Sequence, residues 1–180
     1  MIIDDHFYLL SLERIRQLKA RYCRFIDTKQ WARLPSLFTE DCRFEGLGSA
    51  PAGADVATFV AGVSARLQNT ISVHHCHMPE IAMTGPNTAR GIWAMDDYVE
   101  WQDGSPVKEA PGHRGFRGFG HYEEEYRSDS GEWRISFLRL ARLRIDALPD
   151  DNPHALMGQR QATPDWLDHL DAEYLNWSSN

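Results

Sequence analysis

The sequence predicts an α+β domain in which N-terminal helices pack on a curved, cone-shaped antiparallel sheet and enclose a hydrophobic pocket. Up to about residue 70, apolar side chains recur mostly at spacings of three and four, which is typical of amphipathic helices. From residue 74 onward the period changes to two, which is typical of half-buried strands. Hydrophobic residues make up 42% of the 180 residues, which predicts one domain with a sizeable core.

Three helices and one strand are expected in the N-terminal part. Residues 11–27 form the first helix, because Ser11 can cap it and its apolar residues share one face. Those residues are Ile15, Leu18, Tyr22 and Phe25. Residues 31–38 form a second, short helix, CRFEGLG forms a strand, and residues 55–67 form a third helix.

An antiparallel meander of four strands follows. Turn residues at 85–87 (Gly-Pro-Asn) and 129–131 (Asp-Ser-Gly) separate neighbouring strands. The expected strands cover residues 74–83, 88–101, 118–128 and 133–145.

Two segments fall outside this plan. Residues 103–119 are rich in glycine and proline, so they form a long connection that is either a mobile, solvated loop or a flap over the pocket. Residues 147–180 form a C-terminal extension to the domain of residues 1–146. Within it, Thr163 and Pro164 can start a short amphipathic helix that docks on its own domain or on a neighbouring subunit.

Composition and charge exclude several classes of partner. A net charge of −7 argues against nucleic acid, and no apolar run approaches the roughly 20 residues of a membrane span. The N-terminus lacks the basic region and cleavage site of a secretory signal. The scattered cysteines Cys23, Cys42 and Cys76 are typical of a reduced cytoplasm. We therefore expect a cytoplasmic protein.

Polar residues interrupt two apolar faces. In the strand GIWAMDDYVEW, Asp97 lies on the same face as Trp93, Met95, Val99 and Trp101. A carboxylate there needs either a partner or a raised pKa, so it belongs to a structural ion pair or to a site.

A second carboxylate, Asp27, lies near the C-terminal end of the first helix, where the helix dipole disfavours an anion. Tyr22, on the apolar face of that helix, is either a core tyrosine or a hydroxyl donor. The last strand alternates so that either Arg139 or Arg142 enters an apolar layer, and periodicity does not choose between them.

The stretch SVHHCHMPE contains three histidines. In a strand, His74 faces one way and His75 and His77 face the other. The latter pair could chelate zinc, but a third ligand would have to come from elsewhere. One histidine acting as an acid–base catalyst needs only an orienting carboxylate, which Asp27 or Asp97 could supply. A zinc site and an acid–base site therefore remain alternatives.

The segments IRQLKARYCRFID, SVHHCHMPEI, GIWAMDDY and GEWRISFLRLARLRID resemble the SnoaL-like branch of the nuclear transport factor 2-like superfamily, from about residue 11 to 146. Within that branch they are most similar to bile-acid 7α-dehydratase-like proteins, and also to scytalone dehydratase and hexachlorocyclohexane dehydrochlorinase. The resemblance implies that five residues form the active site: Tyr22, Asp27, His74, Asp97 and Arg142. The resemblance thus favours His74 over His75 and His77, and Arg142 over Arg139. The lysine that the dehydrochlorinase has at the place of Tyr22 is absent.

This resemblance implies a cofactor-independent lyase of the dehydratase type, with a His–Asp dyad and neither a cofactor nor a catalytic metal. The substrate would be a hydrophobic, hydroxylated aromatic or polycyclic molecule in a pocket lined by Trp93, Met95, Trp101 and Tyr122. Alternatives are a γ-formaldehyde lyase acting on a lignin-derived diarylpropane diol, a ring isomerase or cyclase, and a small-molecule binding module without catalysis. Relatives form dimers or trimers, so a homodimer or homotrimer is expected.

Overall fold

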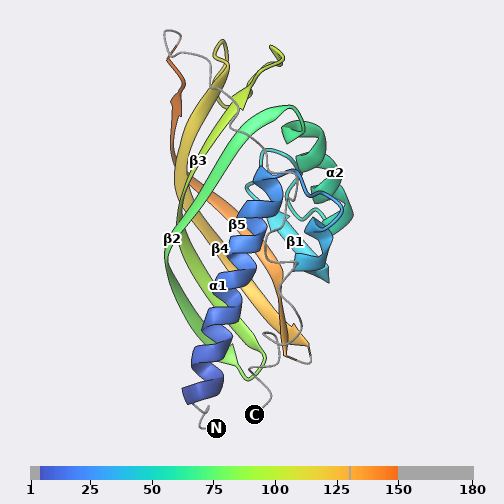
Figure 1. Cartoon of the computed structure of the whole chain (residues 1–180), viewed down its shortest axis with the longest axis vertical. Helices are drawn as coiled ribbons and strands as arrows, with labels where there is room; N and C mark the ends of the chain where they lie inside the picture. The colour runs from blue at the N-terminus through green and yellow to red at the C-terminus, as the bar shows by residue number, and fades with distance from the viewer. Residues whose placement is uncertain (1–4, 130, 150–180) are drawn as a thin grey trace, which may run out of the picture.

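The computed structural model describes residues 5–129 and 131–149. Two α-helices, one 3₁₀ turn and five strands make up these residues (Figure 1). They are α1 (Asp5–Asp27), η1 (Leu34–Leu37), β1 (Phe38–Glu45), α2 (Val56–Leu67), β2 (Thr70–Gly85), β3 (Thr88–Trp101), β4 (Gly115–Asp129) and β5 (Glu132–Ala147).

The five strands form one curved, unclosed sheet in the order β1-β5-β4-β3-β2. The predicted α+β class and the antiparallel meander from β2 to β5 are confirmed. Strand β1 differs from the meander because it joins β5 in parallel, with Phe44 opposite Leu138. The sheet is therefore mixed at this edge.

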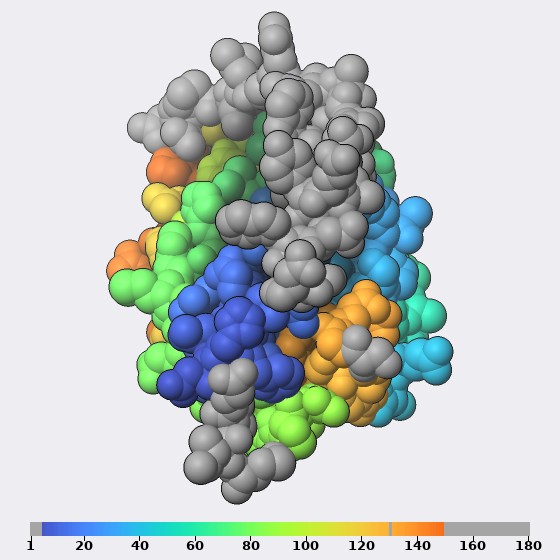
Figure 2. Space-filling view, turned by 60° about the horizontal axis from the view of Figure 1, so that its bottom comes forward, coloured from blue at the N-terminus to red at the C-terminus, as the bar shows by residue number. Residues whose placement is uncertain are grey.

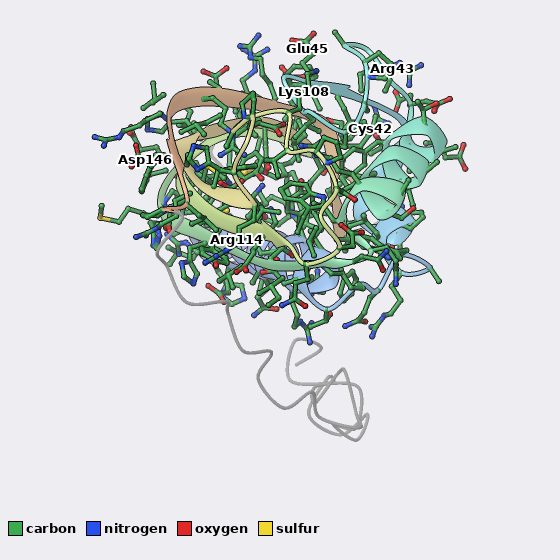
Figure 3. All side chains as sticks on the ribbon, turned by 90° about the horizontal axis from the view of Figure 1, so that it is seen from above. Cys42, Arg43, Glu45, Lys108, Arg114 and Asp146 are labelled. Carbon is green, nitrogen blue, oxygen red and sulfur yellow. The ribbon has the colours of Figure 1, made fainter. Side chains whose placement is uncertain are left out.

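Both α-helices pack on the same side of the sheet (Figure 1). Helix α1 crosses β2 and β5, and Figure 2 shows its blue atoms between the green atoms of β2 and the orange atoms of β5. Helix α2 packs on β1, where Phe59 stacks on Phe44 with ring centroids 4.1 Å apart. Viewed from above, side chains fill the space between Asp146 of β5 and Cys42 of β1 (Figure 3). The core thus lies between the inner face of the sheet and the two helices.

Three predicted elements in the N-terminal part need correction. The first helix begins at Asp5 and not at Ser11, which is buried within it and does not cap it. The helix expected over residues 31–38 is only the 3₁₀ turn η1, because Phe38 is already extended and pairs with Ile135 of β5. The strand expected from Cys42 starts four residues earlier and ends at Glu45. It ends there because Gly46 has φ +69°, and a Cβ at that position would collide with the carbonyl oxygen of Leu140.

The predicted connection over residues 103–119 is shorter than expected, because β4 already begins at Gly115. Val107 and Ala110 in this connection are only 3% and 4% exposed. The segment therefore packs on the domain and does not lie free in solvent. The predicted terminal helix from Thr163 lies outside the described residues. No helix among the described residues is long and apolar enough to cross a membrane.

Candidate active site

The end of α1 and the start of β2 bring a carboxylate and an imidazole together. Nδ1 of His74 lies 2.6 Å from Oδ1 of Asp27. The backbone N–H of His74 donates to Oδ2 of the same carboxylate at 2.8 Å, and the Ser72 hydroxyl donates to Oδ1 at 3.0 Å. The side chain of His74 is only 8% exposed. The predicted pairing of His74 with Asp27 is thus present in the geometry.

The local sequence explains why the helix stops at this carboxylate. Lys29 adopts φ +61°, a left-handed conformation that ends α1 directly after Asp27. The Lys29 ammonium donates to the Ser72 hydroxyl at 2.7 Å, and Ser72 in turn donates to Asp27. A lysine, a serine and an aspartate therefore form a chain of hydrogen bonds that orients the carboxylate toward His74.

Tyr22 lies five positions before Asp27 on α1, and it lines the same pocket as His74. Its side chain is 1% exposed, and its ring meets that of Tyr122 edge-on with centroids 5.9 Å apart. Burial raises the pKa of Tyr22 well above its ordinary value, and the charges of Cys23 and Glu124 act in the same direction. Tyr22 is therefore a neutral hydrogen-bond donor at physiological pH.

Asp97 and Arg142 form a bidentate ion pair on the inner face of the sheet. Nη1 of Arg142 donates to Oδ1 of Asp97 at 2.7 Å, and Nη2 donates to Oδ2. Burial lowers the pKa of Arg142, but the hydrogen bonds and charge of Asp97 outweigh it, so the net direction is upward. Gly118 of β4 leaves the room for this pair, because a Cβ there would lie well inside 3.0 Å of atoms of both residues.

The choice between Arg139 and Arg142, the two candidate arginines of β5, also follows from the geometry. Arg142 enters the apolar layer, whereas Arg139 is half-exposed and pairs with Glu123 on the other face. An irregularity in the β4–β5 register, between Phe119 and Gly120, lies beside Arg142.

A pocket lies between the sheet, the two helices and two loops. The volume inside it that a water-sized sphere can occupy is about 70 Å³. Four of the five predicted catalytic residues line it, and the fifth, Asp27, lies behind His74. Those four are Tyr22, His74, Asp97 and Arg142. The apolar wall includes Phe59, Val99, Trp101, Phe116 and Leu140.

The predicted pocket residues divide into two groups. Trp101 and Tyr122 line the pocket, as expected. Trp93 does not, because it lies further along β3, where its indole N–H donates to the Tyr126 hydroxyl at 2.8 Å. Met95 is also absent from the lining, although its sulfur lies 3.9 Å from Nη1 of Arg142.

Sequence reasoning missed a buried ion pair beneath the pocket. The ammonium of Lys19 contacts the carboxylate of Glu124, and both side chains are fully buried. The same ammonium lies over the rings of Tyr22 and Tyr122, at 4.2 and 3.5 Å from their centroids. The sequence does indicate that Lys19 is buried. It lies four positions after Ile15 and three before Tyr22, which places it on the inner face of α1.

A second missed pair lies on the pocket wall. Arg66 near the end of α2 pairs with Glu109 of the connection between β3 and β4, and both residues line the pocket. The Arg66 guanidinium also lies 5.1 Å from the ring centroid of Trp101. The connection that could have been a flap thus contributes one side chain to the pocket.

A family model of the SnoaL-like domain matches residues 8–139 of the chain. A curated relative, the probable cyclase FGR4 of Gibberella zeae, is 28% identical over 139 residues, covering 72% of this chain and 89% of that protein.

Solved structures give the same fold. The "Putative Scytalone Dehydratase" from Novosphingobium aromaticivorans has a TM-score of 0.68 at 15% identity, covering 81% of this chain and 93% of that one. A hexachlorocyclohexane dehydrochlorinase (LinA) of type 2 has a TM-score of 0.67 at 18% identity, covering 84% and 100%. Since the family model spans well over half of the 180 residues, the chain belongs to the SnoaL-like domain family of the nuclear transport factor 2-like superfamily.

Proposed function

We propose that the protein is a cofactor-independent lyase of the dehydratase type that acts on a hydrophobic, hydroxylated molecule with aromatic or fused rings. The observation that carries this proposal is the 2.6 Å contact between His74 Nδ1 and Asp27 Oδ1 beside a pocket with an aromatic wall. Names of similar structures, which include a dehydratase and a dehydrochlorinase, point to elimination chemistry as well.

His74 is the acid–base residue of the proposed reaction. Because Nδ1 of the imidazole is hydrogen-bonded to Asp27, Nε2 can accept a proton from the carbon atom next to a substrate carbonyl. The carboxylate of Asp27 stabilises the imidazolium that results. His74 then gives the proton to the hydroxyl group on the adjacent (β) carbon. The C–O bond breaks, water is released, and a carbon–carbon double bond forms between the α and β carbons. A positioned acid or base of this kind supplies about 10²- to 10⁴-fold in rate.

Tyr22 and Arg142 stabilise the negative charge that develops on the substrate oxygen. The neutral hydroxyl of Tyr22 donates a hydrogen bond to the enolate oxygen. Arg142 adds a positive charge to the pocket lining, and its two hydrogen bonds to Asp97 fix the plane of its guanidinium. Such groups act most strongly where apolar side chains exclude water, which the aromatic wall supports.

Ring closure is the second candidate, because the relative that is 28% identical carries the name of a probable cyclase. The same groups would serve this reaction. His74 would remove the proton from the attacking carbon, and Tyr22 would donate to the carbonyl oxygen that is attacked. The product would keep the mass of the substrate unless a later loss of water followed.

Turnover of a defined panel of compounds, with products identified by mass spectrometry, tests the proposal. The panel contains hydroxylated steroids, β-hydroxy ketones and lignin-type diarylpropane diols. A product lighter by one water indicates the dehydratase, one lighter by formaldehyde a deformylating lyase, and one of unchanged mass a cyclase or isomerase.

Variants connect the activity to the site. His74→Ala and Asp27→Asn should each lower turnover of the active compound by about 10²- to 10⁴-fold while the fold persists. His121→Ala is the matched control and should keep full turnover, because it lies between Gly120 and Tyr122 and so faces the other side of β4. If one compound binds tightly to wild type and to His74→Ala alike and none is turned over, the proposal fails in favour of a binding module.

A further inference from the structure

Three potential metal ligands meet on the outer face of the sheet, on the side away from the pocket. His75 and His77 of β2 and Asp96 of β3 each offer one ligand atom, and these three atoms lie within 4.8 Å of one another. Oδ1 of Asp96 is 2.9 Å from Nε2 of His77 and 3.6 Å from Nδ1 of His75. The histidine side chains are 57% and 52% exposed, so the cluster is open to solvent.

The strand register explains why these side chains converge. His75 and His77 alternate with His74 along β2, so they share the face opposite the pocket. His75 pairs directly with Asp96, and His77 pairs with Ala94, whose small side chain leaves space between the two imidazoles and the carboxylate. The third ligand that two histidines on a strand need is therefore supplied by the neighbouring strand.

We propose that His75, His77 and Asp96 form a binding site for a divalent cation of the Zn²⁺ type. Zinc bonds imidazole nitrogen and carboxylate oxygen at about 2.0–2.2 Å. Tetrahedral geometry then separates neighbouring ligand atoms by roughly 3.4 Å. The two separations from Oδ1 of Asp96, 2.9 and 3.6 Å, lie on either side of that value, and the two imidazole nitrogens lie within 4.8 Å of each other. Three protein ligands leave the fourth position to water.

The donor set determines the class of cation. Two imidazole nitrogens favour zinc, copper or nickel, whereas magnesium and calcium prefer sites made of oxygen atoms alone. The position of the site separates it from the proposed catalytic reaction, because His74 faces the pocket and Asp27 instead. The inference therefore does not depend on the proposed function.

Arg117 gives this site a feature that can be tested. Its Nη2 lies 3.6 Å from Oδ2 of Asp96, the carboxylate oxygen that does not face the histidines. The guanidinium places a positive charge beside the site and so opposes a second cation. Its side chain is 55% exposed, so solvent weakens this repulsion. Removing the charge with Arg117→Gln should tighten zinc binding by about two- to fivefold.

The test uses the full chain without a histidine tag, stripped of metal with a chelator and kept in a thiol-free reductant. Competition with a chromogenic chelator should give one Zn²⁺ bound per chain. His75→Ala, His77→Ala and Asp96→Asn should each weaken binding by at least about tenfold. His6→Ala, an exposed histidine at the start of α1, and Cys76→Ser should leave binding unchanged.

Circular dichroism confirms that each variant is folded, so that loss of binding can be assigned to the lost ligand. Tighter binding in Arg117→Gln together with loss in His77→Ala supports the site. Absence of stoichiometric binding in wild type overturns the inference. Binding that survives in a His75→Ala/His77→Ala double variant also overturns it, because the ion would then lie elsewhere.

Discussion

The carboxylate of Asp27 and the imidazole of His74 are 47 positions apart in sequence and meet at 2.6 Å. The helix dipole disfavours an anion at the end of α1. Three hydrogen bonds from β2 offset this effect: from the Ser72 hydroxyl, the His74 backbone and the His74 ring. The position of Asp27, unfavourable in an isolated helix, is thus stabilised by the strand that carries its partner.

Replacing Asp27 by Asn tests the charge of this pair. The amide keeps the size of the carboxylate but removes the negative charge that stabilises the imidazolium of His74. We expect kcat to fall by about 10²- to 10⁴-fold on the substrate identified by the panel. Ser72→Ala removes only one of the three hydrogen bonds and should have a smaller effect. Steady-state kinetics check both variants, and an Asp27→Asn enzyme as active as wild type would contradict the role of the dyad.

A methyl group at Gly118 should disrupt the ion pair between Asp97 and Arg142. A Cβ at this position would lie well inside 3.0 Å of Nη1 of Arg142 and of Oδ1 of Asp97. We expect Gly118→Ala to lower the free energy of unfolding by about 1–3 kcal/mol and to reduce turnover, because the guanidinium must move. Urea unfolding and kcat measure the two effects.

Gly85→Ala is the matched control for Gly118→Ala. A Cβ there would meet only the hydroxyl of Thr88, a side chain at a turn that can rotate. This variant should keep its turnover. If Gly118→Ala behaves in the same way, the pair does not depend on the space that Gly118 leaves.

Periodicity predicted which face of most helices and strands is buried. It did not predict where along an element a residue reaches the pocket. Alternation correctly placed Trp93 and Trp101 on the inner face of β3. It could not show that Trp101 reaches the pocket while Trp93 bonds to Tyr126. Whether a buried residue reaches the pocket depends on how the sheet curves and where the helices lie, and these are properties of the tertiary structure.

The site residues show a similar limit. Alternation separates His74 from its two neighbours, but it does not say which face is inside, so the choice of His74 needed the family resemblance. Lys19 was missed because a lysine counts as polar in any hydrophobic pattern. Its contacts with Glu124, 105 positions away, and with the ring of Tyr122 explain its burial, and neither is local in sequence.

The buried pair of Lys19 and Glu124 should be strongly coupled. Lys19→Met leaves a carboxylate without its cation in a site closed to solvent, and Glu124→Leu leaves an ammonium. Each single variant should lose about 3–5 kcal/mol of unfolding free energy. The double variant should lose much less than the sum, because no unpaired charge remains.

Urea unfolding of the wild type, both single variants and the double variant measures this coupling. Arg139→Gln, which breaks the half-exposed contact with Glu123, is the control and should leave the free energy of unfolding nearly unchanged, because solvent screens that pair. Additive losses in the Lys19 and Glu124 variants would show that the two side chains act independently.

Stability should fall steeply at alkaline pH. Burial raises the pKa of Tyr22 and of Tyr126 well above ordinary values, and nearby charges add to the effect. Burial lowers the pKa of Lys19, but Glu124 outweighs it, so that the net direction is also upward.

The folded protein therefore keeps protons that the unfolded chain releases near pH 10. Because the folded state binds more protons there, the free energy of unfolding decreases as pH rises. This stabilisation is complete below about pH 10 and is lost above it, by about 1.4 kcal/mol per pH unit for each group. Urea unfolding at intervals from pH 8 to pH 11.5 checks the slope.

Tyr126→Phe identifies one source of this slope. The variant loses the hydroxyl that bonds to Glu124, so it should be less stable at neutral pH. Its stability should then fall less steeply above pH 10, by about 1.4 kcal/mol per pH unit, because one titrating group is gone. Trp93→Phe is the control: it removes the indole donor to Tyr126 but keeps the phenol. It should lower stability at neutral pH without flattening the alkaline limb, and equal slopes in both variants would exclude Tyr126 as a source of the pH dependence.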